Sequence, residues 1–430
     1  MNRLKGKTFS INIQGCRTNL YEGEAITYSL EKAGAIYKEN APDVVVIVSC
    51  TITSAAERKC RKLIRKIRRE SPLTLIIVCG CYAQKLTEEE RQRFGIDILV
   101  GSRLKYKLPE IIADHFEFPE TAVSFALSEN ELLKETTWDS LELDRPRLHT
   151  RAFLKVQDGC NHYCSYCIIP YVRGKPVSRN MDESIAEAIK IVESGCSEIV
   201  LTGIHIGLYE NLDILVRRIG GIKGIKRLRF GSIEPFAVTD KLLCALAETE
   251  VFCHHLHLPL QSGDDGVLNQ MRRGYTVDEY RKNVDNVRKK LGERVHISTD
   301  LMIGFPGEDD NAFENSMNLI KEIEFGKIHV FPYSRRAGTN AAQMPLLPVN
   351  IIRERKNEAL IIAEELHEKY CSSWIGEKVS ILVEEKKRRI VSGLTPHYIR
   401  VCKEDKGEKT SDIVDVIPER YENGILISNQ

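Results

Sequence analysis

The stretch from Gly159 to Cys167 constrains this chain more than any other, because it places three cysteines at Cys-x₃-Cys-x₂-Cys spacing. A loop this short can present three thiolates to one soft metal centre, but it offers no fourth ligand. A structural zinc site is closed by four protein ligands, and a ferredoxin-type 4Fe–4S cluster uses four cysteines at a different spacing. The alternative is three buried thiols that pack as small hydrophobic groups. The spacing favours a cubane cluster with one iron open to an external ligand.

Cys160, Cys164 and Cys167 resemble the motif of radical S-adenosylmethionine (SAM) enzymes. The resemblance implies that they hold a 4Fe–4S cluster, and that its open iron chelates the amino and carboxylate groups of SAM. An electron from the cluster would then split SAM into methionine and a 5′-deoxyadenosyl radical. Tyr166 resembles the aromatic residue that lies near the SAM adenine in this family.

The first 115 residues alternate strand and helix patterns. Phe9–Ile13 alternates apolar and polar residues, whereas Val44–Val48 and Leu75–Val78 are continuous apolar runs, typical of parallel strands covered on both faces. Ser54–Glu70 carries its apolar residues on one helical face. We therefore expect an α/β fold here, a doubly wound domain over residues 1–115.

Cys16, Cys50 and Cys81 each follow one of these strands. The carboxyl ends of the strands in an open parallel sheet share one edge, so the topology predicts that these thiols gather in a second three-thiolate site. The alternative is that three thiols fall at strand ends by chance. Cys60, on the apolar face of the helix, and Cys79, inside a strand, are interpreted as core residues.

The loops around these three cysteines resemble the signature loops of methylthiotransferases, which are radical SAM enzymes. The resemblance implies that the cysteines hold an auxiliary 4Fe–4S cluster whose open iron carries sulfide or a methylthio group. Ser49 stands where many members have Asn, and this departure leaves the cysteine pattern intact. The loops are Gly15-Cys16-Arg17-Thr18-Asn19, Ser49-Cys50-Thr51-Ile52-Thr53 and Gly80-Cys81-Tyr82-Ala83-Gln84.

Residues 149–372 are expected to form a second domain, after a connector over residues 116–148 with one short strand around Thr121–Phe125. Helical patterns, one of them opened by a Thr276/Glu279 capping box, separate six candidate strands. Six such units with three thiols after the first strand resemble the partial (β/α)₆ barrel of radical SAM enzymes. The candidate strands are Phe153–Gln157, Ile199–Gly203, Leu228–Ser232, Leu256–Gln261, His296–Met302 and Ile328–Tyr333.

Polar residues stand at the carboxyl ends of these strands, where the chemistry of a barrel gathers. Buried there they need partners, and a zwitterionic, ribose-bearing ligand offers them. Each residue alone could equally be an internal hydrogen-bonding group. The segments 231–235, 258–263 and 304–308 also resemble family motifs, which favours contacts with SAM. Together with Tyr166, the candidate SAM-binding residues are Thr202, Ser232, Glu234, Gln261 and Asp300.

The last segment, residues 373–430, alternates apolar and polar residues in short runs between turns, which predicts a small antiparallel β-barrel. It resembles the TRAM domain that closes most methylthiotransferases and binds RNA. We expect two basic groups to contact RNA phosphates rather than to form a solvated surface. They are Arg61, Lys62, Arg65 and Lys66 on the helix 54–70, and Lys386, Lys387, Arg388 and Arg389 in the tail.

Cys50-Thr51-Ile52-Thr53 and the segment His329–Ser334 most resemble the branch that acts on N6-threonylcarbamoyladenosine in tRNA. The resemblance implies conversion of this nucleoside, at position 37 beside the anticodon, to its 2-methylthio derivative. One SAM would methylate the sulfur, and a second would supply the radical that removes hydrogen from adenine C2. Arg335 and Arg336 are candidates to bind the threonylcarbamoyl carboxylate. The implied partners are the tRNA anticodon loop, a sulfur source and a reductant of the flavodoxin or ferredoxin type.

Three alternatives stay open at this point. A methylthiotransferase of isopentenyladenosine or of a ribosomal-protein aspartate would use the same cysteines, although the basic groups argue against a protein substrate. A non-catalytic Fe–S electron carrier would need other residues to complete each three-cysteine site. A cobalamin-dependent radical enzyme would usually carry an Asp-x-His-x-x-Gly run, and the sequence has none.

The composition, 42% hydrophobic and 29% charged residues in a chain of 430, is that of a globular protein of two or three domains. The sequence has no apolar run long enough to span a bilayer, and its start leads into a strand rather than an apolar signal core. We therefore expect a cytoplasmic protein without a membrane partner. Its thirteen cysteines then indicate metal or redox chemistry rather than disulfides. The net charge of +1 does not indicate what kind of partner the protein binds, so the local basic groups are more informative about partners.

Overall fold

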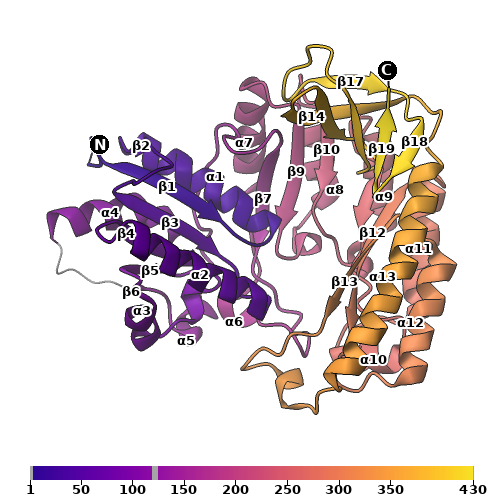
Figure 1. Cartoon of the computed structure of the whole chain (residues 1–430), viewed down its shortest axis with the longest axis horizontal. Coiled ribbons are helices and arrows are strands. Elements are labelled where there is room, and N and C mark those ends of the chain that lie inside the picture. Colours follow the sequence, from indigo (N-terminus) through magenta and orange to yellow (C-terminus); the bar gives the residue numbers. More distant parts are fainter. Residues whose placement is uncertain (1–2, 119–123, 430) are drawn as a thin grey trace.

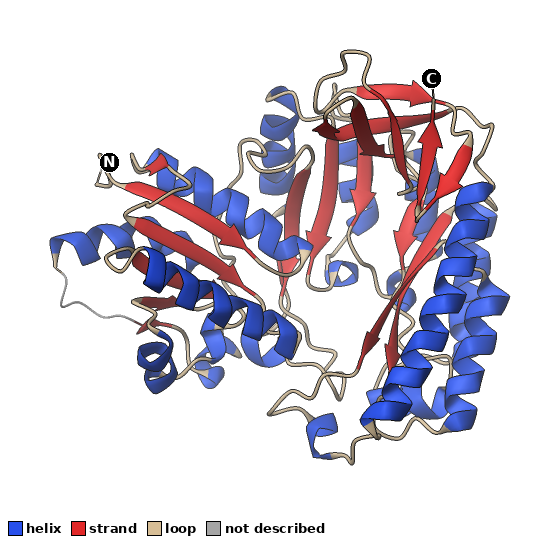
Figure 2. Cartoon of the chain, in the orientation of Figure 1, coloured by secondary structure: helices blue, strands red, loops and turns tan. Residues whose placement is uncertain are grey.

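The computed structural model of the protein describes residues 3–118 and 124–429. The chain builds an α/β domain, then a partial barrel, then a curled β-sheet, in sequence order (Figures 1 and 2). These three parts confirm the predicted fold class. No helix in the described residues is both long and apolar enough to cross a bilayer. The domain boundaries at residues 115, 148 and 372 stay predictions.

The N-terminal part is one parallel sheet with helices on both faces. Its strands are β1 (Thr8–Ile13), β2 (Ile36–Tyr37), β3 (Val44–Ser49), β4 (Leu75–Gly80), β5 (Ile98–Val100) and β6 (Ser124–Phe125), in the order β2-β1-β3-β4-β5-β6. Its helices are α1 (Arg17–Lys32), α2 (Ser54–Glu70), α3 (Glu88–Phe94), α4 (Leu108–Glu117) and α5 (Glu129–Leu132).

Strand β3 shows why this domain is doubly wound. Val44 and Val46 pack in a cluster with side chains of α1 and α4, whereas Val45 and Ile47 pack with side chains of α2 on the other face. The strand order reverses between β1 and β3, and ligands of open parallel sheets bind at such a point, beyond the carboxyl ends of the strands. The predicted connector strand is described only at Ser124–Phe125, where it pairs with β5, because residues 119–123 lie outside the described residues.

The central part has the six parallel strands of the predicted barrel. Its strands are β7 (Ala152–Asp158), β8 (Val177–Ser178), β9 (Glu198–Gly203), β10 (Arg227–Phe230), β11 (His255–His257), β12 (His296–Ile303) and β13 (Lys327–Pro332). Its helices are α6 (Ile169–Arg173), α7 (Met181–Glu193), α8 (Leu212–Gly220), α9 (Asp240–Glu248), α10 (Asp265–Met271), α11 (Val277–Leu291), α12 (Asp310–Ile323) and α13 (Val349–Ser372).

The barrel consists of two sheets, β10-β9-β7-β8 and β11-β12-β13, in which only β8 runs antiparallel. Bridges from Leu228 to Phe252 and from Ser232 to His257 join the two sheets. Two strands are shorter than predicted: β10 ends at Phe230 and β11 at His257. Pro259 has no N–H to donate to a sheet ladder, so the apolar run after β11 is buried without being a strand.

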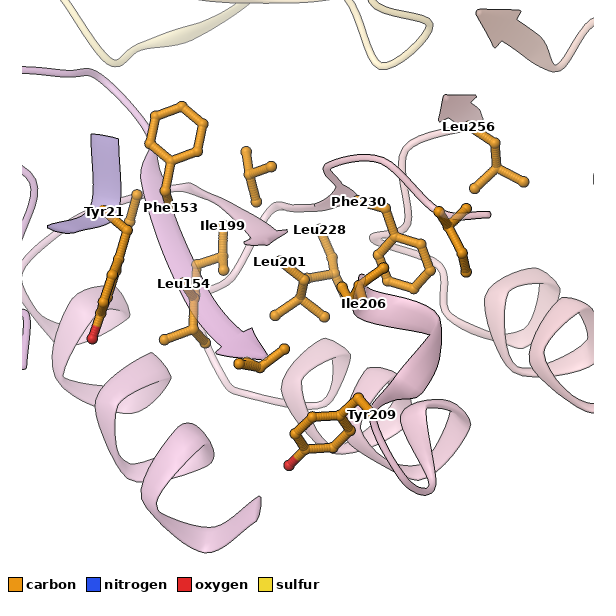
Figure 3. Close-up of a cluster of buried hydrophobic side chains, with 14 of the residues drawn as sticks. Tyr21, Phe153, Leu154, Ile199, Leu201, Ile206, Tyr209, Leu228, Phe230 and Leu256 are labelled. Atoms are coloured by element: carbon orange, nitrogen blue, oxygen red, sulfur yellow. The ribbon is translucent and has the colours of Figure 1, made fainter. Parts of the chain in front are cut away.

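The N-terminal domain packs against the barrel through α1, which contacts β7 (Figure 1). One cluster of buried apolar side chains continues across this boundary, from Tyr21 on α1 to Leu154 on β7, Leu201 on β9 and Phe230 on β10 (Figure 3). The two parts therefore share a core.

The C-terminal part is a curled, mainly antiparallel sheet in the order β17-β14-β15-β16-β19-β18, with one parallel pair, β16 and β19. Its strands are β14 (Val379–Lys387), β15 (Ile390–Leu394), β16 (Arg400–Glu404), β17 (Ile413–Val416), β18 (Arg420–Glu422) and β19 (Ile425–Ser428).

The loop between β15 and β16 covers the amino ends of the barrel strands. Arg229 on β10 donates hydrogen bonds to the carbonyl oxygens of Thr395 (3.1 Å) and Pro396 (3.0 Å). The ring of Tyr398 stacks on His255, with centroids 4.6 Å apart. The C-terminal sheet therefore closes the end of the barrel opposite the cysteine loops.

Candidate active site

The three cysteines of the opening motif form one group directly after β7. Gly159 has a φ of +72°, and a Cβ there would overlap the carbonyl oxygen of Lys175, so only glycine fits before Cys160. The backbone N–H of His162 donates to the Cys160 Sγ at 3.4 Å. Burial raises the pKa of Cys160 to about 11, and it also raises the pKa of Cys164 and Cys167. In Cys160 and Cys167, a neighbouring thiol of the group raises the pKa further.

Cys16, Cys50 and Cys81 converge as the topology predicts, at the carboxyl ends of β1, β3 and β4. Gly15, at φ +111°, lets the first loop approach the second: a Cβ there would lie 2.6 Å from the Cys50 Cβ. Burial first, and then the neighbouring Cys81 and Cys16, raise the pKa of Cys50 to about 12. Cys60 and Cys79 are fully buried in the apolar core, as expected.

Each group of thiols offers three soft sulfur donors and no fourth ligand, which is a donor set that a 4Fe–4S cluster accepts. A 4Fe–4S cluster binds each thiolate on a different iron, so its ligands stand farther apart than those of one ion. Three soft sulfur donors without a fourth ligand match such a cluster.

The two cysteine groups are neighbours. Cys81 packs in one apolar cluster with Ile168 and Ile169, and Cys160 and Cys167 pack against the same cluster. Helix α6 follows the Cys160–Cys167 loop directly and ends at Arg173, whose Nε donates a hydrogen bond to the Cys81 Sγ at 3.0 Å. One short segment therefore connects both groups.

Arg173 belongs to a buried network of charges that the sequence did not reveal. Its Nη1 lies 2.6 Å from Glu22 and 3.2 Å from Asp158. Burial disfavours the charged form of Glu22, yet the surrounding cations hold its pKa at about 2. Lys155, a charged residue inside the candidate strand Phe153–Gln157, was the available signal. The network consists of Glu22, Lys105, Asp139, Lys155, Asp158 and Arg173, each with a side chain no more than 1% exposed.

Two cavities open between the cysteine groups and the barrel. The larger, about 370 Å³, is lined by Cys16 and Arg17 from the N-terminal domain and by Thr202, Ser232 and His257 from the barrel. The smaller has a volume of about 180 Å³ and contains Tyr166, Cys167 and Gln261 in its wall. Ile52, Ile169 and Asp300 line both cavities, so the two spaces meet at these residues.

The predicted SAM-binding residues divide between these cavities. Tyr166, Gln261 and Asp300 line the smaller one, whereas Thr202, Ser232 and Asp300 line the larger one. The buried Oε1 of Gln261 and hydroxyl of Tyr333 have no hydrogen-bond partner among the described residues. Buried polar atoms are rarely left unpaired, so the smaller cavity fits a ligand that carries polar groups. Gln261 also has a φ of +71°, a strained conformation of the kind found at ligand sites.

Glu234, the sixth candidate, lies outside both linings. It forms an ion pair with Arg273, which donates a hydrogen bond to the Cys164 Sγ at 3.3 Å. Arg273 is almost fully buried and was not identified from the sequence. In each cysteine group, therefore, one thiol accepts a hydrogen bond from a buried arginine: Cys81 from Arg173, and Cys164 from Arg273.

Some side chains of the basic groups predicted to bind RNA already bond to other residues of the protein, and others are exposed. Arg61 donates a hydrogen bond to the hydroxyl of Tyr82 at 2.8 Å, whereas Lys62, Arg65 and Lys66 are exposed along α2. In the turn between β14 and β15, Lys386 pairs with Asp405 (2.8 Å) and Lys387 with Glu385 (3.1 Å). Arg388 and Arg389 are exposed at the same turn.

The two arginines predicted to bind the substrate carboxylate differ. Arg336 is buried and forms an ion pair with Glu57 at 2.6 Å, so its guanidinium is already neutralised, contrary to the expectation of a free one. Glu57 comes from α2, 279 residues earlier, and no local pattern announces the contact. Arg335 is exposed and donates a hydrogen bond to the carbonyl oxygen of Met344 at 3.0 Å.

Known proteins match the chain over nearly its whole length. Residues 154–320 match the model of the radical SAM superfamily, and residues 8–101 that of the uncharacterized protein family UPF0004. The chain is 35% identical over 426 residues to the threonylcarbamoyladenosine tRNA methylthiotransferase MtaB of Bacillus subtilis (strain 168), with 95% of this chain and 93% of that protein covered. The chain belongs to the radical SAM methylthiotransferase family.

Other members of this family and more distant proteins also match. A tRNA-2-methylthio-N(6)-dimethylallyladenosine synthase of Caldicellulosiruptor saccharolyticus is 31% identical, with 91% of this chain and 85% of that protein covered. The radical SAM methyltransferase TsrM of Kitasatospora setae, whose structure contains cobalamin and a 4Fe–4S cluster, has a TM-score of 0.60 at 14% identity, with 78% and 76% covered. At this sequence identity, the similarity shows that the two proteins share a fold and nothing about a shared function.

Membership in the methylthiotransferase family confirms the resemblance drawn from the cysteine motifs. The chain is an enzyme of the transferase class, which excludes the alternative of a non-catalytic electron carrier. The family implies one 4Fe–4S cluster and SAM. Cys160, Cys164 and Cys167 lie inside the region that matches the radical SAM model and fit this cluster.

Proposed function

We propose that this methylthiotransferase converts N6-threonylcarbamoyladenosine at position 37 of tRNA to its 2-methylthio derivative. Two relatives named for this nucleoside, from Bacillus subtilis and Chlamydia pneumoniae, are 35% and 33% identical to the chain. Relatives named for dimethylallyladenosine, the isopentenyl nucleoside, reach 33%, so identity alone does not separate the two substrates.

The observation that carries the proposal is the wall of the larger cavity. It contains Arg17, Thr18, Thr202, Ser232, His257 and His329 and the carboxylate of Asp300, beside the apolar Ile52 and Ile169. A threonylcarbamoyl group brings a carboxylate and a hydroxyl, which such side chains can pair. An apolar isopentenyl group would instead bury these polar atoms without partners, at a cost in binding free energy.

The two cysteine groups are assigned different roles. Cys160, Cys164 and Cys167 would hold the 4Fe–4S cluster that binds SAM, and Cys16, Cys50 and Cys81 would hold an auxiliary 4Fe–4S cluster. When bound, these groups supply one-electron cleavage of SAM and the sulfur that is transferred. Tyr166, Gln261 and Asp300 would hold SAM in the smaller cavity, with Thr202, Ser232 and Glu234 nearby. A sulfur source and a reductant of the flavodoxin or ferredoxin type complete the proposed partners.

The position of the larger cavity fits a base taken from RNA. The cavity lies between Cys16 and the barrel residues, so a base within it would stand beside the group of Cys16, next to the smaller cavity that Cys167 lines. Bases of an anticodon loop are unpaired, and moving one into a protein pocket costs less than flipping a base out of a duplex.

The substrate assignment predicts a clear preference between two tRNAs that differ only in carrying threonylcarbamoyl or isopentenyl on the same adenosine. Reconstituted enzyme with SAM, reductant and sulfide should methylthiolate the first several-fold faster, as measured by mass spectrometry of the digested nucleosides. Preference for the isopentenyl tRNA would contradict the substrate assignment and leave the methylthiotransferase activity intact.

Helix α2 is placed to guide RNA towards the site. Ser54 and Glu57 in its first turn bond to Arg336 at the end of the barrel strand β13 (both 2.6 Å). The helix is therefore fixed at the barrel mouth, and its exposed Lys62, Arg65 and Lys66 continue outward from that point. We propose that these three side chains contact tRNA phosphates, together with Arg388 and Arg389 of the C-terminal sheet.

Replacing Lys62, Arg65 and Lys66 with glutamine should weaken tRNA binding and flatten its salt dependence. Each phosphate that is no longer neutralised should lower the log–log slope by about 0.7 to 0.9. A matched control replaces the exposed Lys282, Lys289 and Lys290 of α11, on the far side of the barrel (Figure 1). Equal slopes in both variants would show that the face of α2 is only solvated.

A further inference from the structure

Arg17 is the arginine in the wall of the larger cavity, and no ion pair to a carboxylate is found for it among the described residues. It opens α1, directly after Cys16, and its half-buried side chain lines the larger cavity. Its one hydrogen bond in the described part of the chain goes from Nη2 to the hydroxyl of Tyr398, at 3.4 Å. The guanidinium therefore has hydrogen-bond donors to spare.

Several other arginines around the barrel are paired. Arg173 has Glu22, Arg273 has Glu234 and Arg336 has Glu57 as a partner. Arg151, Arg227 and Arg229 share Glu198. Asp300, the carboxylate in the wall of the larger cavity, lies 3.3 Å from the Nε2 of His257. Burial opposes the charge of Asp300, but His257, His329 and Arg17 together lower its pKa. Arg17 therefore faces this carboxylate without an ion pair to it, and its remaining donors point to a partner that the substrate brings.

We propose that Arg17 binds the carboxylate of the threonylcarbamoyl group and thereby selects the nucleoside. The inference rests on the proposed function. A guanidinium can donate two parallel hydrogen bonds to a carboxylate, and these charge-assisted bonds are stronger than neutral ones. Facing an isopentenyl group, the same cation would lose water without gaining a partner. Arg17 is thus a specificity-determining residue that contacts the substrate.

The place of Arg17 in the chain agrees with the geometry of the substrate. In adenine, C2 and the N6-bearing C6 flank the same ring nitrogen, N1, so the modified side chain begins close to the atom that is to be thiolated. Arg17 is the neighbour of Cys16 in sequence, and both line the same cavity. A carboxylate bound by Arg17 would keep the base beside the auxiliary cysteines.

Tyr398, in the loop between β15 and β16, accepts the hydrogen bond from Arg17. It comes from the C-terminal sheet, and its ring is fixed by stacking on His255 at 4.6 Å. The contact from Arg17 to Tyr398 therefore connects the proposed RNA-binding domain to the pocket for the base. Tyr398→Phe removes this hydrogen bond and keeps the stacked ring, which makes it a mild test of the positioning.

The test compares wild type, Arg17→Gln, Arg17→Lys and Tyr398→Phe on the threonylcarbamoyl tRNA and the isopentenyl tRNA. The ratio of kcat/KM on the two tRNAs should fall about 10- to 100-fold in Arg17→Gln, as expected for removing a hydrogen bond to a charged group. It should fall less in Arg17→Lys, which keeps the charge but not the paired donors, and least in Tyr398→Phe. Iron content measured alongside shows whether the neighbouring Cys16 site is intact.

A binding experiment adds a readout independent of turnover. Wild type should bind the threonylcarbamoyl tRNA more tightly than the same tRNA with plain adenosine, and Arg17→Gln should abolish this difference. An unchanged preference in Arg17→Gln, or an equal weakening on both tRNAs, would overturn the role of Arg17. A wild-type preference for the isopentenyl tRNA would instead overturn the proposed function, so the two failures are distinguishable.

Discussion

Replacing Cys160, Cys164 and Cys167 with alanine should abolish SAM cleavage and leave about half of the iron in the reconstituted protein, since each 4Fe–4S cluster carries about four of roughly eight irons. These thiols follow β7 and adjoin the smaller cavity, where Tyr166 and Gln261 offer contacts to SAM. Iron analysis and chromatography of 5′-deoxyadenosine give the two measurements.

The matched variant replaces Cys16, Cys50 and Cys81 and should separate the two reactions. It should also keep about half of the iron, but it should still cleave SAM while sulfur transfer to tRNA disappears. Full iron content in this variant would contradict the auxiliary cluster. Absence of SAM cleavage in both variants would show that the two groups act as one site.

Replacing Arg173 with methionine should cost about 3 to 5 kcal/mol of unfolding free energy, because it leaves Glu22 and Asp158 buried with fewer cations. The measurement is urea unfolding of the metal-free protein. A matched control is Arg281→Met, since Arg281 pairs with Glu322 and Asp278 on the surface, and such pairs contribute about 0 to 1 kcal/mol.

A second variant tests whether charge, rather than the shape of the side chain, causes this destabilisation. Adding Glu22→Gln to Arg173→Met removes one buried negative charge and should recover part of the stability, because the two residues are coupled. Similar destabilisation in Arg173→Met and Arg281→Met would mean that the network contributes little. A double variant that is less stable than either single variant would lead to the same conclusion.

The sequence predicted those parts of the molecule that depend on local patterns. The bounds of α2, Ser54–Glu70, follow from its one-sided apolar stripe and agree with the structure. The meeting of Cys16, Cys50 and Cys81 followed from topology alone, because parallel strands bring their carboxyl ends to one edge. The end of β11 was misplaced because the apolar run around it was given more weight than Pro259, which cannot donate a hydrogen bond to a sheet ladder.

Contacts between distant segments could not be predicted in the same way. The pairing of Arg336 with Glu57 joins residues of two domains, and it removed one of two candidates for the substrate carboxylate. Arg17 stood inside a recognised signature loop, yet its orientation towards the larger cavity emerges only from the packing of α1 against β7. Side-chain roles at a domain boundary depend on tertiary structure rather than on periodicity.

The buried charge network also sets an order for synthesis on the ribosome. Glu22 and Lys105 emerge well before Lys155, Asp158 and Arg173, and 151 residues separate Glu22 from Arg173. At about 5 to 20 residues per second, this gap lasts roughly 8 to 30 s. For the later part of it, after Lys105 has been made, α1 carries a glutamate that has not met two of its three cations, Lys155 and Arg173. We expect the first domain to remain open until α6 has left the exit tunnel, so the two cysteine groups would be completed together rather than in turn.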